Sequence, residues 1–237
     1  MQVDLPDLTL LFENLLSAPV EPFPPDLLRD NIEAFDEDLR ERIQGLACDK
    51  CIDPERIQIY TDGSYDPTSD SPVGWGFVAI TCGRHGYVLE HLACGFVDDF
   101  CPILHGQPVP LSARTGEVEA LLQATIWSIC SLRCLPFSLF YDAISVGHSA
   151  MGRWNHKPED IHMRILRAIT QFAEHYHERG FHGEHVFSHS GILGNEVANF
   201  LANFARQQRF ECGSPKINLA PYTCGDRMPI EWLWLYD

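Results

Sequence analysis

The pattern of hydrophobic and polar residues predicts strands and helices in alternation between about residue 56 and residue 208. Five segments combine apolar, β-branched and aromatic residues over a length that suits a strand. They lie at residues 57–61, 77–81, 87–96, 137–141 and 185–187. The second and third are separated by a turn at residues 83–86 with a glycine at each end, which predicts a hairpin.

Three other segments repeat apolar residues at intervals of three and four, which is the spacing of one helix face. The first follows Gly116 and contains Ala120, Leu121, Ala124 and Ile126. The other two contain Ile161, Ile165, Ile169 and Phe172, and Val197, Phe200, Leu201 and Phe204. The order of elements is three strands, a helix, a strand, helices, a strand and a helix. This order predicts the α/β class, with a mixed five-stranded sheet flanked by helices.

Composition divides the chain into three parts. They are an acidic helical leader or linker, the candidate domain and a tail, at residues 1–55, 56–208 and 209–237. Two helices are predicted in the leader, over Leu8–Leu16 and Pro25–Leu46, with a proline-rich stretch between them. The leader either docks on the domain or links it to an upstream one. Residues 231–236 are apolar enough that we expect the tail to pack on the domain or on a partner.

Acidic residues stand at the ends of predicted elements. Asp62 ends the first strand before a Gly63-Ser64 turn, and Asp142 ends the fourth strand. Open sheets bind ligands at the carboxyl ends of their strands. Glu117 lies on the first turn of the following helix, so its side chain can lean back toward the same edge. Neighbouring carboxylates repel one another, and a divalent cation such as Mg²⁺ or Mn²⁺ relieves that cost.

Each acid also has a second interpretation. Asp62 would serve in an ordinary Asp-Gly turn, and Asp142 would serve as the N-cap of the next helix. Glu119 is the alternative to Glu117, although it projects from nearly the opposite face of the helix. The second interpretations are independent of one another, and all of them would have to be correct at once. The occurrence of all three acids in this order therefore favours the metal site.

Five motifs follow one another along the chain. They are Asp62-Gly63-Ser64, Gly74-Trp75-Gly76, Glu117 with Ala120, Asp142, and a block running from His189 through Gly191, Asn195 and Glu196 to Asn199. Their order resembles the type 1 ribonuclease H family, in the form attached to reverse transcriptases of retroelements such as non-LTR retrotransposons. The resemblance spans residues 56–206, and the ordered set is far more specific than Asp-Gly-Ser alone. It implies a ribonuclease H-like fold, with three antiparallel strands and then parallel ones.

The resemblance implies an endonuclease that hydrolyses the RNA strand of an RNA/DNA hybrid with two Mg²⁺ ions, or with Mn²⁺ instead. The metal ligands that it implies are Asp62, Glu117, Asp142 and Asn199. His189 would assist proton movement or product release. Substrate contacts would fall on Gly63, Ser64 and Asn195. The 2′-hydroxyl that distinguishes RNA from DNA would be recognised by the Gly63-Ser64 turn together with Glu117. The implied partners are the hybrid and the other domains of a reverse transcriptase polyprotein.

Asn199 stands where the family has its last metal-binding aspartate. An amide oxygen can touch a metal ion but carries no charge, so the resemblance implies impaired activity. The sequence leaves open whether the asparagine is natural or introduced. Glu196 lies one helical turn earlier and could act in its place, although the family gives it no metal role. The alternatives are an inactive hybrid-binding or scaffold domain, and another nuclease on this fold, such as an exonuclease or DNA-strand transferase.

Charge and cysteine content limit what can be expected of nucleic-acid binding and of the cellular compartment. The formal net charge of -16 opposes phosphate binding, but residues 1–55 contribute 14 acids and 4 bases, which is -10 of that total. We therefore expect weak, salt-sensitive binding of nucleic acid. Nine scattered cysteines suit a reducing compartment. The sequence shows neither a long apolar span nor a basic signal-peptide start, which predicts an intracellular protein, nuclear or cytoplasmic.

Overall fold

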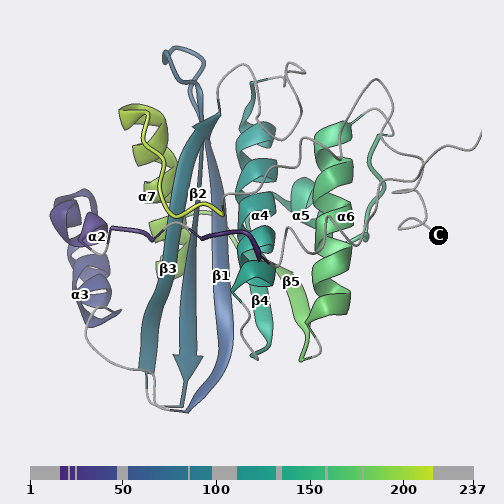
Figure 1. The fold of residues 1–237 in the computed structure, drawn as a ribbon. Coiled ribbons are helices and arrows are strands. Elements are labelled where there is room, and N and C mark those ends of the chain that lie inside the picture. Colours follow the sequence, from purple (N-terminus) through teal and green to yellow (C-terminus); the bar gives the residue numbers. More distant parts are fainter. Residues whose placement is uncertain are drawn as a thin grey trace, which may run out of the picture.

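A five-stranded sheet forms the centre of the computed structural model (Figure 1). The structure describes residues 17–215 except 21, 25, 47–52, 85, 98–110, 132–134, 158–159 and 178. The strands lie in the order β3-β2-β1-β4-β5. Their bounds are Pro54–Tyr65 for β1, Val73–Gly83 for β2, Gly86–Val97 for β3, Phe137–Tyr141 for β4 and Phe181–His185 for β5.

Strand directions match the predicted mixed sheet. β1 and β2 are antiparallel, as are β2 and β3, because short turns connect them. β4 is parallel to both β1 and β5, and such pairs require crossover connections, which helices provide here. The sheet therefore confirms three antiparallel strands followed by parallel ones.

Helices cover both faces of the sheet (Figure 1). The longer ones are α4 at Ala113–Cys130, α6 at Ile161–Tyr176 and α7 at Leu193–Gln208, and the shorter ones are α2 at Leu27–Asp30, α3 at Glu37–Leu46 and α5 at Ile144–Ala150. α4, α5 and α6 share one hydrophobic core with the sheet, whereas α2, α3 and α7 share the other. No helix in the described part of the chain has the length and apolar character needed to cross a bilayer.

Successive side chains of β1 point to opposite faces of the sheet and contribute to both hydrophobic cores. Ile57 and Ile59 point into the core under α4, whereas Tyr60 points into the core under α7. Glycines in β2 let α7 approach closely: a Cβ atom on Gly74 would lie 2.1 Å from the carbonyl oxygen of Ala202. The Gly74-Trp75-Gly76 motif therefore serves the packing of α7 on the sheet.

Two predicted strand limits are wrong. β1 does not stop at a Gly63-Ser64 turn, because Gly63 and Ser64 pair with Trp75 and Gly74 of β2 and the strand continues to Tyr65. The last strand lies at Phe181–His185 rather than at residues 185–187. In both cases the pairing with a neighbouring strand sets the limit, and local sequence does not reveal that pairing.

The predicted helix at Pro25–Leu46 is instead divided into α2, a 3₁₀ turn at Ile32–Ala34, and α3. The side chain of Asn31 donates to the carbonyl of Leu27, and Asp36 Oδ1 accepts from the backbone N–H of Leu39, so polar side chains interrupt and restart the helix. α2 and α3 dock on α7 through the second core. The predictions for Leu8–Leu16 and for residues 231–236 lie outside the described residues.

Candidate metal centre

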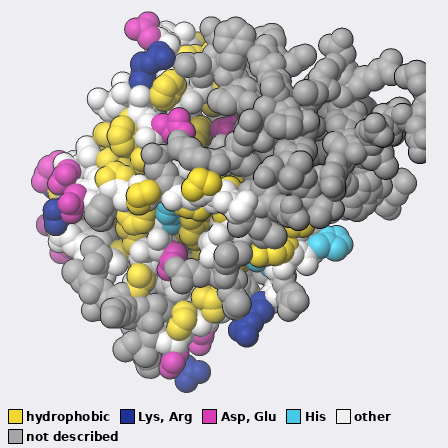
Figure 2. Space-filling model, in the orientation of Figure 1, with side chains coloured by type: hydrophobic (Ala, Val, Ile, Leu, Met, Phe, Trp, Pro, Cys, Tyr) yellow, Lys and Arg dark blue, Asp and Glu magenta, His cyan; other side chains and the backbone are white. Residues whose placement is uncertain are grey.

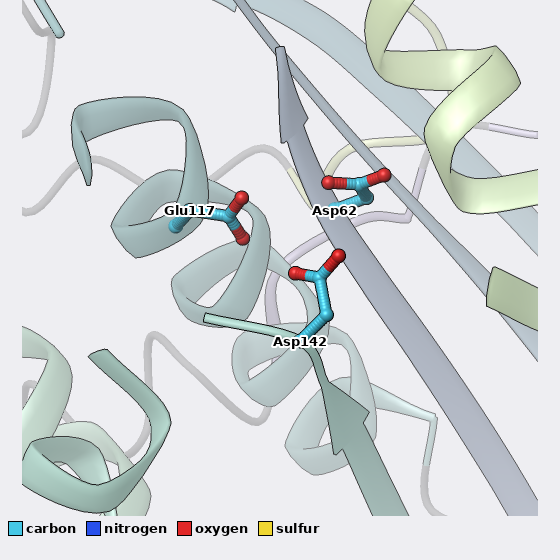
Figure 3. A group of neighbouring side chains, drawn as sticks. All are labelled: Asp62, Glu117 and Asp142. Carbon is cyan, nitrogen blue, oxygen red and sulfur yellow. The ribbon is translucent and has the colours of Figure 1, made fainter. Parts of the chain in front are cut away.

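Three carboxylates converge at one edge of the sheet (Figure 3). Asp62 projects from the interior of β1, Asp142 follows the end of β4, and Glu117 lies on α4. One oxygen atom of each carboxylate lies within 4.8 Å of the corresponding atoms of the other two. The structure therefore brings together the three acids on which the sequence prediction rested.

The difference in length between β1 and β4 places the two aspartates side by side. The parallel pairing ends at Tyr60 opposite Phe140, and β4 stops at Tyr141. Asp142 thus leaves the sheet beside Asp62, where β1 continues alone on that side. Asp62 is only 6% exposed, so it is a strand residue held in the interior and not a turn residue.

Glycines on β1 and α4 let the backbones meet. A Cβ atom on Gly63 would lie 2.4 Å from the backbone nitrogen of Glu117, and one on Gly116 would lie 2.7 Å from the carbonyl oxygen of Gly74. The helix starts at Ala113 because Ser112 caps it through the N–H of Thr115. Glu117 consequently falls in the second turn of α4, one turn later than predicted.

Mutual repulsion and burial govern the electrostatics of the site. The pKa of Asp62 is raised from 3.8 to about 8, first by burial and then by the charge of Asp142. The pKa of Glu117 is raised well above its ordinary value by burial and by the charges of Asp62 and Asp142. A hydrogen bond from the backbone of Gly63 opposes both shifts. The centre thus holds protons more tightly than three separate carboxylates would.

One atom of the centre fits a bound cation directly. Oε2 of Glu117 is buried and has no hydrogen-bond partner. A buried carboxylate oxygen left without a donor is costly unless another group satisfies it. Three converging carboxylates are hard oxygen donors of the kind that Mg²⁺ and Mn²⁺ prefer, so the residues present suit a divalent cation.

The surroundings of the acids exclude two of the other interpretations. Asp142 does not cap α5, whose N-cap is Ala143; instead its Oδ2 accepts a hydrogen bond from Ser188 Oγ at 2.7 Å. Glu119 is buried on another side of α4, where its Oε2 lies 3.0 Å from Nε2 of His162. Glu117 is therefore the glutamate of this helix that joins the centre.

Asn199 lies on α7 in a chain of polar contacts that leads to β1. Asn203 Nδ2 donates to Oδ1 of Asn199 at 2.9 Å, and Ser64 Oγ donates to Oδ1 of Asn203 at 2.8 Å. Arg206, 10% exposed at its side chain, donates from Nε to Ser64 Oγ at 3.0 Å and from Nη1 to Asp66 at 3.1 Å. This network ties α7 to β1 two residues beyond Asp62.

The remaining predicted residues lie around the start of α7. His189 has a left-handed backbone with φ 51°, and its side chain is 73% exposed. Its Nδ1 lies 3.9 Å from Oε2 of Glu196, whose other oxygen accepts from the N–H of Gly191 at 3.2 Å. Asn195 is 1% exposed, and its Oδ1 has no hydrogen-bond partner. His189 is thus accessible to a substrate, whereas Asn195 is enclosed.

Sequence reasoning missed several residues that shape the centre. Ser188 had no signal, because a serine before a loop histidine has no fixed role. Gly116 had one, since a glycine inside a helical pattern is unfavourable for the helix and commonly has a packing reason. Asn203 and Arg206 follow Asn199 at intervals of four and three, and this row of polar residues along one side of the helix was the available signal.

Comparison with known proteins identifies similar folds. No family model matches the chain, and no curated protein matches it. Among solved structures, it is similar to RNase H1 from the halophilic archaeon Halobacterium salinarum, with 19% identity and a TM-score of 0.48, over 65% of this chain and 98% of that one. It is also similar to an N-terminal RNase H domain from Mycobacterium tuberculosis, with 18% identity and a TM-score of 0.49, over 65% and 96%.

A viral structure is similar to the same extent. It is the foamy viral protease-reverse transcriptase in complex with an RNA/DNA hybrid, with 18% identity and a TM-score of 0.48, over 68% of this chain and 21% of that one. At these identities and TM-scores, none of the similarities carries an argument about activity. The strand directions by themselves are those that the motif resemblance implied, and the fold is ribonuclease H-like.

Proposed function

We propose that this protein is a metal-dependent endonuclease that hydrolyses the RNA strand of RNA/DNA hybrids, with activity impaired by Asn199. The observation that carries the proposal is the convergence of Asp62, Glu117 and Asp142 within 4.8 Å on a ribonuclease H-like sheet. Acids from three separate elements meet there at a cost in repulsion that a bound cation offsets. Asp62 is 6% exposed, so the cluster is not a group of solvent-exposed surface acids.

The proposed cofactor is a pair of Mg²⁺ ions, with Mn²⁺ as the alternative. Such ions supply activation of a water nucleophile and stabilisation of the leaving 3′ oxygen. Asp62, Glu117 and Asp142 would hold them, and Ser188 orients Asp142 through its hydrogen bond. Hydrogen bonds of this kind fix the direction of a carboxylate before the metal arrives.

Several residues would contact the substrate. His189, exposed on its loop, would assist proton movement or product release. The Ser64 hydroxyl is bonded to Asn203 and Arg206, so we assign contact with the 2′-hydroxyl to the backbone of Gly63 and Ser64. Asn195 is enclosed, so its unpartnered amide oxygen would contribute only where substrate binding exposes it.

Asn199 explains the proposed impairment. The position receives a hydrogen bond from Asn203 Nδ2 through its side-chain oxygen. An aspartate would accept the same hydrogen bond and add a negative charge, so the surroundings already suit a carboxylate. Replacing Asn199 by aspartate should therefore restore a fourth acidic group without disturbing the helix.

Asn199 also favours the second candidate, a catalytically inactive domain that binds hybrids or serves as a scaffold. The leader adds to that argument, because all seven acids at positions 26–46 are exposed. Figure 2 shows acidic side chains gathered over α2 and α3. Negative charge there would weaken binding to nucleic acid, and other domains of a reverse transcriptase polyprotein would then supply the missing affinity. A retroelement origin belongs to this proposal as well.

Cleavage of a strand-labelled RNA/DNA hybrid in Mg²⁺ and in Mn²⁺ tests the proposal. The parent chain is compared with Asn199→Asp, with the double variant Asn199→Asp/Asp62→Asn, and with an all-DNA duplex as substrate control. We expect Asn199→Asp to cut the RNA strand alone, about 10- to 100-fold faster than the parent, because it regains a charged ligand. The double variant should be inactive. If neither the parent nor Asn199→Asp cuts, the catalytic proposal fails, and hybrid binding in the same samples decides whether the scaffold alternative stands.

A further inference from the structure

Phe187 is an exposed aromatic residue close to the carboxylate centre. Its exposure of 75% is the highest among the large hydrophobic residues in the described part of the chain. Single exposed apolar residues are common and need no explanation by themselves. Phe187 differs because it immediately precedes Ser188, whose hydroxyl is bonded to Asp142. Ile144, two residues beyond Asp142, is also exposed at 40%, so the rim of the centre carries apolar groups.

The backbone on both sides of Phe187 is held in place. The N–H of Val186 donates to the carbonyl of Tyr141 at 2.9 Å. Ser190 Oγ donates to the carbonyl of Phe187 at 2.7 Å. With Ser188 fixed on the other side, this segment is anchored to the end of β4. The ring is therefore presented at a defined place beside the centre.

A second aromatic ring limits the directions that Phe187 can take. The ring of His185 packs against it edge to face, with centroids 5.2 Å apart and an interplanar angle of 81°. One edge of the Phe187 ring is thus occupied while most of its surface stays in water. Aromatic faces in such positions suit the sugars and bases of nucleic acids, which offer flat apolar surfaces.

We propose that Phe187 is a substrate-binding residue that packs against a sugar and the adjoining base edge of the hybrid next to the scissile phosphate. The inference rests on the proposed function. A-form-like duplexes expose their sugars in a wide, shallow minor groove that a projecting ring can reach. The contact is apolar, and the carboxylates around it repel phosphate, so Phe187 supplies affinity that electrostatics does not. Its loss should weaken hybrid binding by about tenfold.

Fluorescence anisotropy with a fluorescein-labelled RNA/DNA hybrid tests this role. The full chain carrying Asp62→Asn serves as the reference, so that binding is measured without cleavage. Phe187→Ala and Phe187→Tyr are added to it, with Tyr87→Ala as the matched control. Tyr87 is 59% exposed but is the second residue of β3, about 20 Å along that strand from the level of Asp62. Thermal unfolding of each variant establishes that folding is unchanged.

We expect Phe187→Ala to raise the Kd about tenfold, Phe187→Tyr to stay within about twofold of the reference, and Tyr87→Ala to have no effect. If the reference binds the hybrid and Phe187→Ala binds it equally well, the inference is overturned while the proposed function stands. If the reference, the unmutated chain and Asn199→Asp all fail to bind, both the inference and the proposed function are overturned.

Discussion

At the scale of single residues, the centre concentrates negative charge that the metal-free protein tolerates poorly. Asp62 is 6% exposed and its pKa is raised to about 8, so the folded state holds a proton there that the unfolded chain, with a pKa near 3.8, has released. Stability from this group is fully present below pH 3.8 and is lost as the pH rises toward 8. The contribution of Asp62 to the stability of the metal-free protein should therefore fall over that range.

Asp62→Asn should stabilise the metal-free protein at pH 8, by on the order of 2 kcal/mol in the free energy of unfolding, because it removes a buried charge. The gain should shrink toward pH 4, where Asp62 is already protonated. Denaturant unfolding in EDTA at both pH values measures it, with Asp70→Asn, an exposed acid, as control.

The same variants distinguish the effect of charge repulsion on stability from the effect of metal binding. Mn²⁺ should raise the melting temperature of the parent and of Asp70→Asn, but not that of Asp62→Asn, because that variant lacks one of the proposed metal ligands. If the Asp62→Asn protein is less stable than the parent at pH 8, Asp62 makes a stabilising contact and its buried charge does not destabilise the protein.

At the scale of elements, the centre depends on how closely β1 and α4 approach. Gly63 and Gly116 have no side chains at the point of contact, and the nearest atoms around a Cβ on Gly63 belong to the backbone of Gly116 and Glu117. Backbone cannot rotate away as a side chain can, so an added methyl group must push the helix from the strand. Glu117 would move with the helix.

Gly63→Ala should destabilise the protein by roughly 1–3 kcal/mol and weaken Mn²⁺ binding, measured by denaturant unfolding and by calorimetric titration. Gly45→Ala is the matched control, because a Cβ on Gly45 in α3 meets nothing within 4 Å. That change should leave metal binding intact and stabilise the helix by about 0.5–1 kcal/mol. Equal effects of the two substitutions would contradict the close-approach argument.

At the scale of the whole molecule, the leader helices complete the second core. Leu39, Ile43 and Leu46 are buried together with residues of α7 such as Val197 and Leu201. α3 also reaches the loop before α7, where Arg42 Nη1 donates to the carbonyl of Gly191 at 2.9 Å. Residues 26–46 therefore pack on α7 from the side opposite the sheet.

Ile43→Ala should reduce the free energy of unfolding by about 2–4 kcal/mol, because Ile43 is 4% exposed and a cavity would remain. Circular dichroism and tryptophan fluorescence should report one common transition, as expected of a single cooperative unit. Glu41→Ala on the exposed face of α3 is the control and should change little. Separate transitions for the two probes would mean that the leader unfolds independently.

Local sequence was sufficient for the type and order of the elements. Apolar residues that repeat with a period of 2 or 3.6 form one face of a strand or helix, and that face is buried however the elements pack. The strands, the long helices α4, α6 and α7 and the three acids could therefore be predicted from residues alone. The order of motifs then led to the mixed sheet, which the strand pairing confirms.

Tertiary structure alone decided where elements end and which side chains meet. β1 runs past Gly63 because β2 pairs with it there, and the leader helix breaks where Asn31 and Asp36 bond to the backbone. Contacts such as Ser188 with Asp142 join residues far apart in the sequence, where no local pattern constrains them. The sequence by itself determined which chemical groups the protein carries and on which elements. The pairing of β4 with β1 and the packing of α4 against β1 decided which of those groups form one centre, because that depends on distances between segments that no local periodicity encodes.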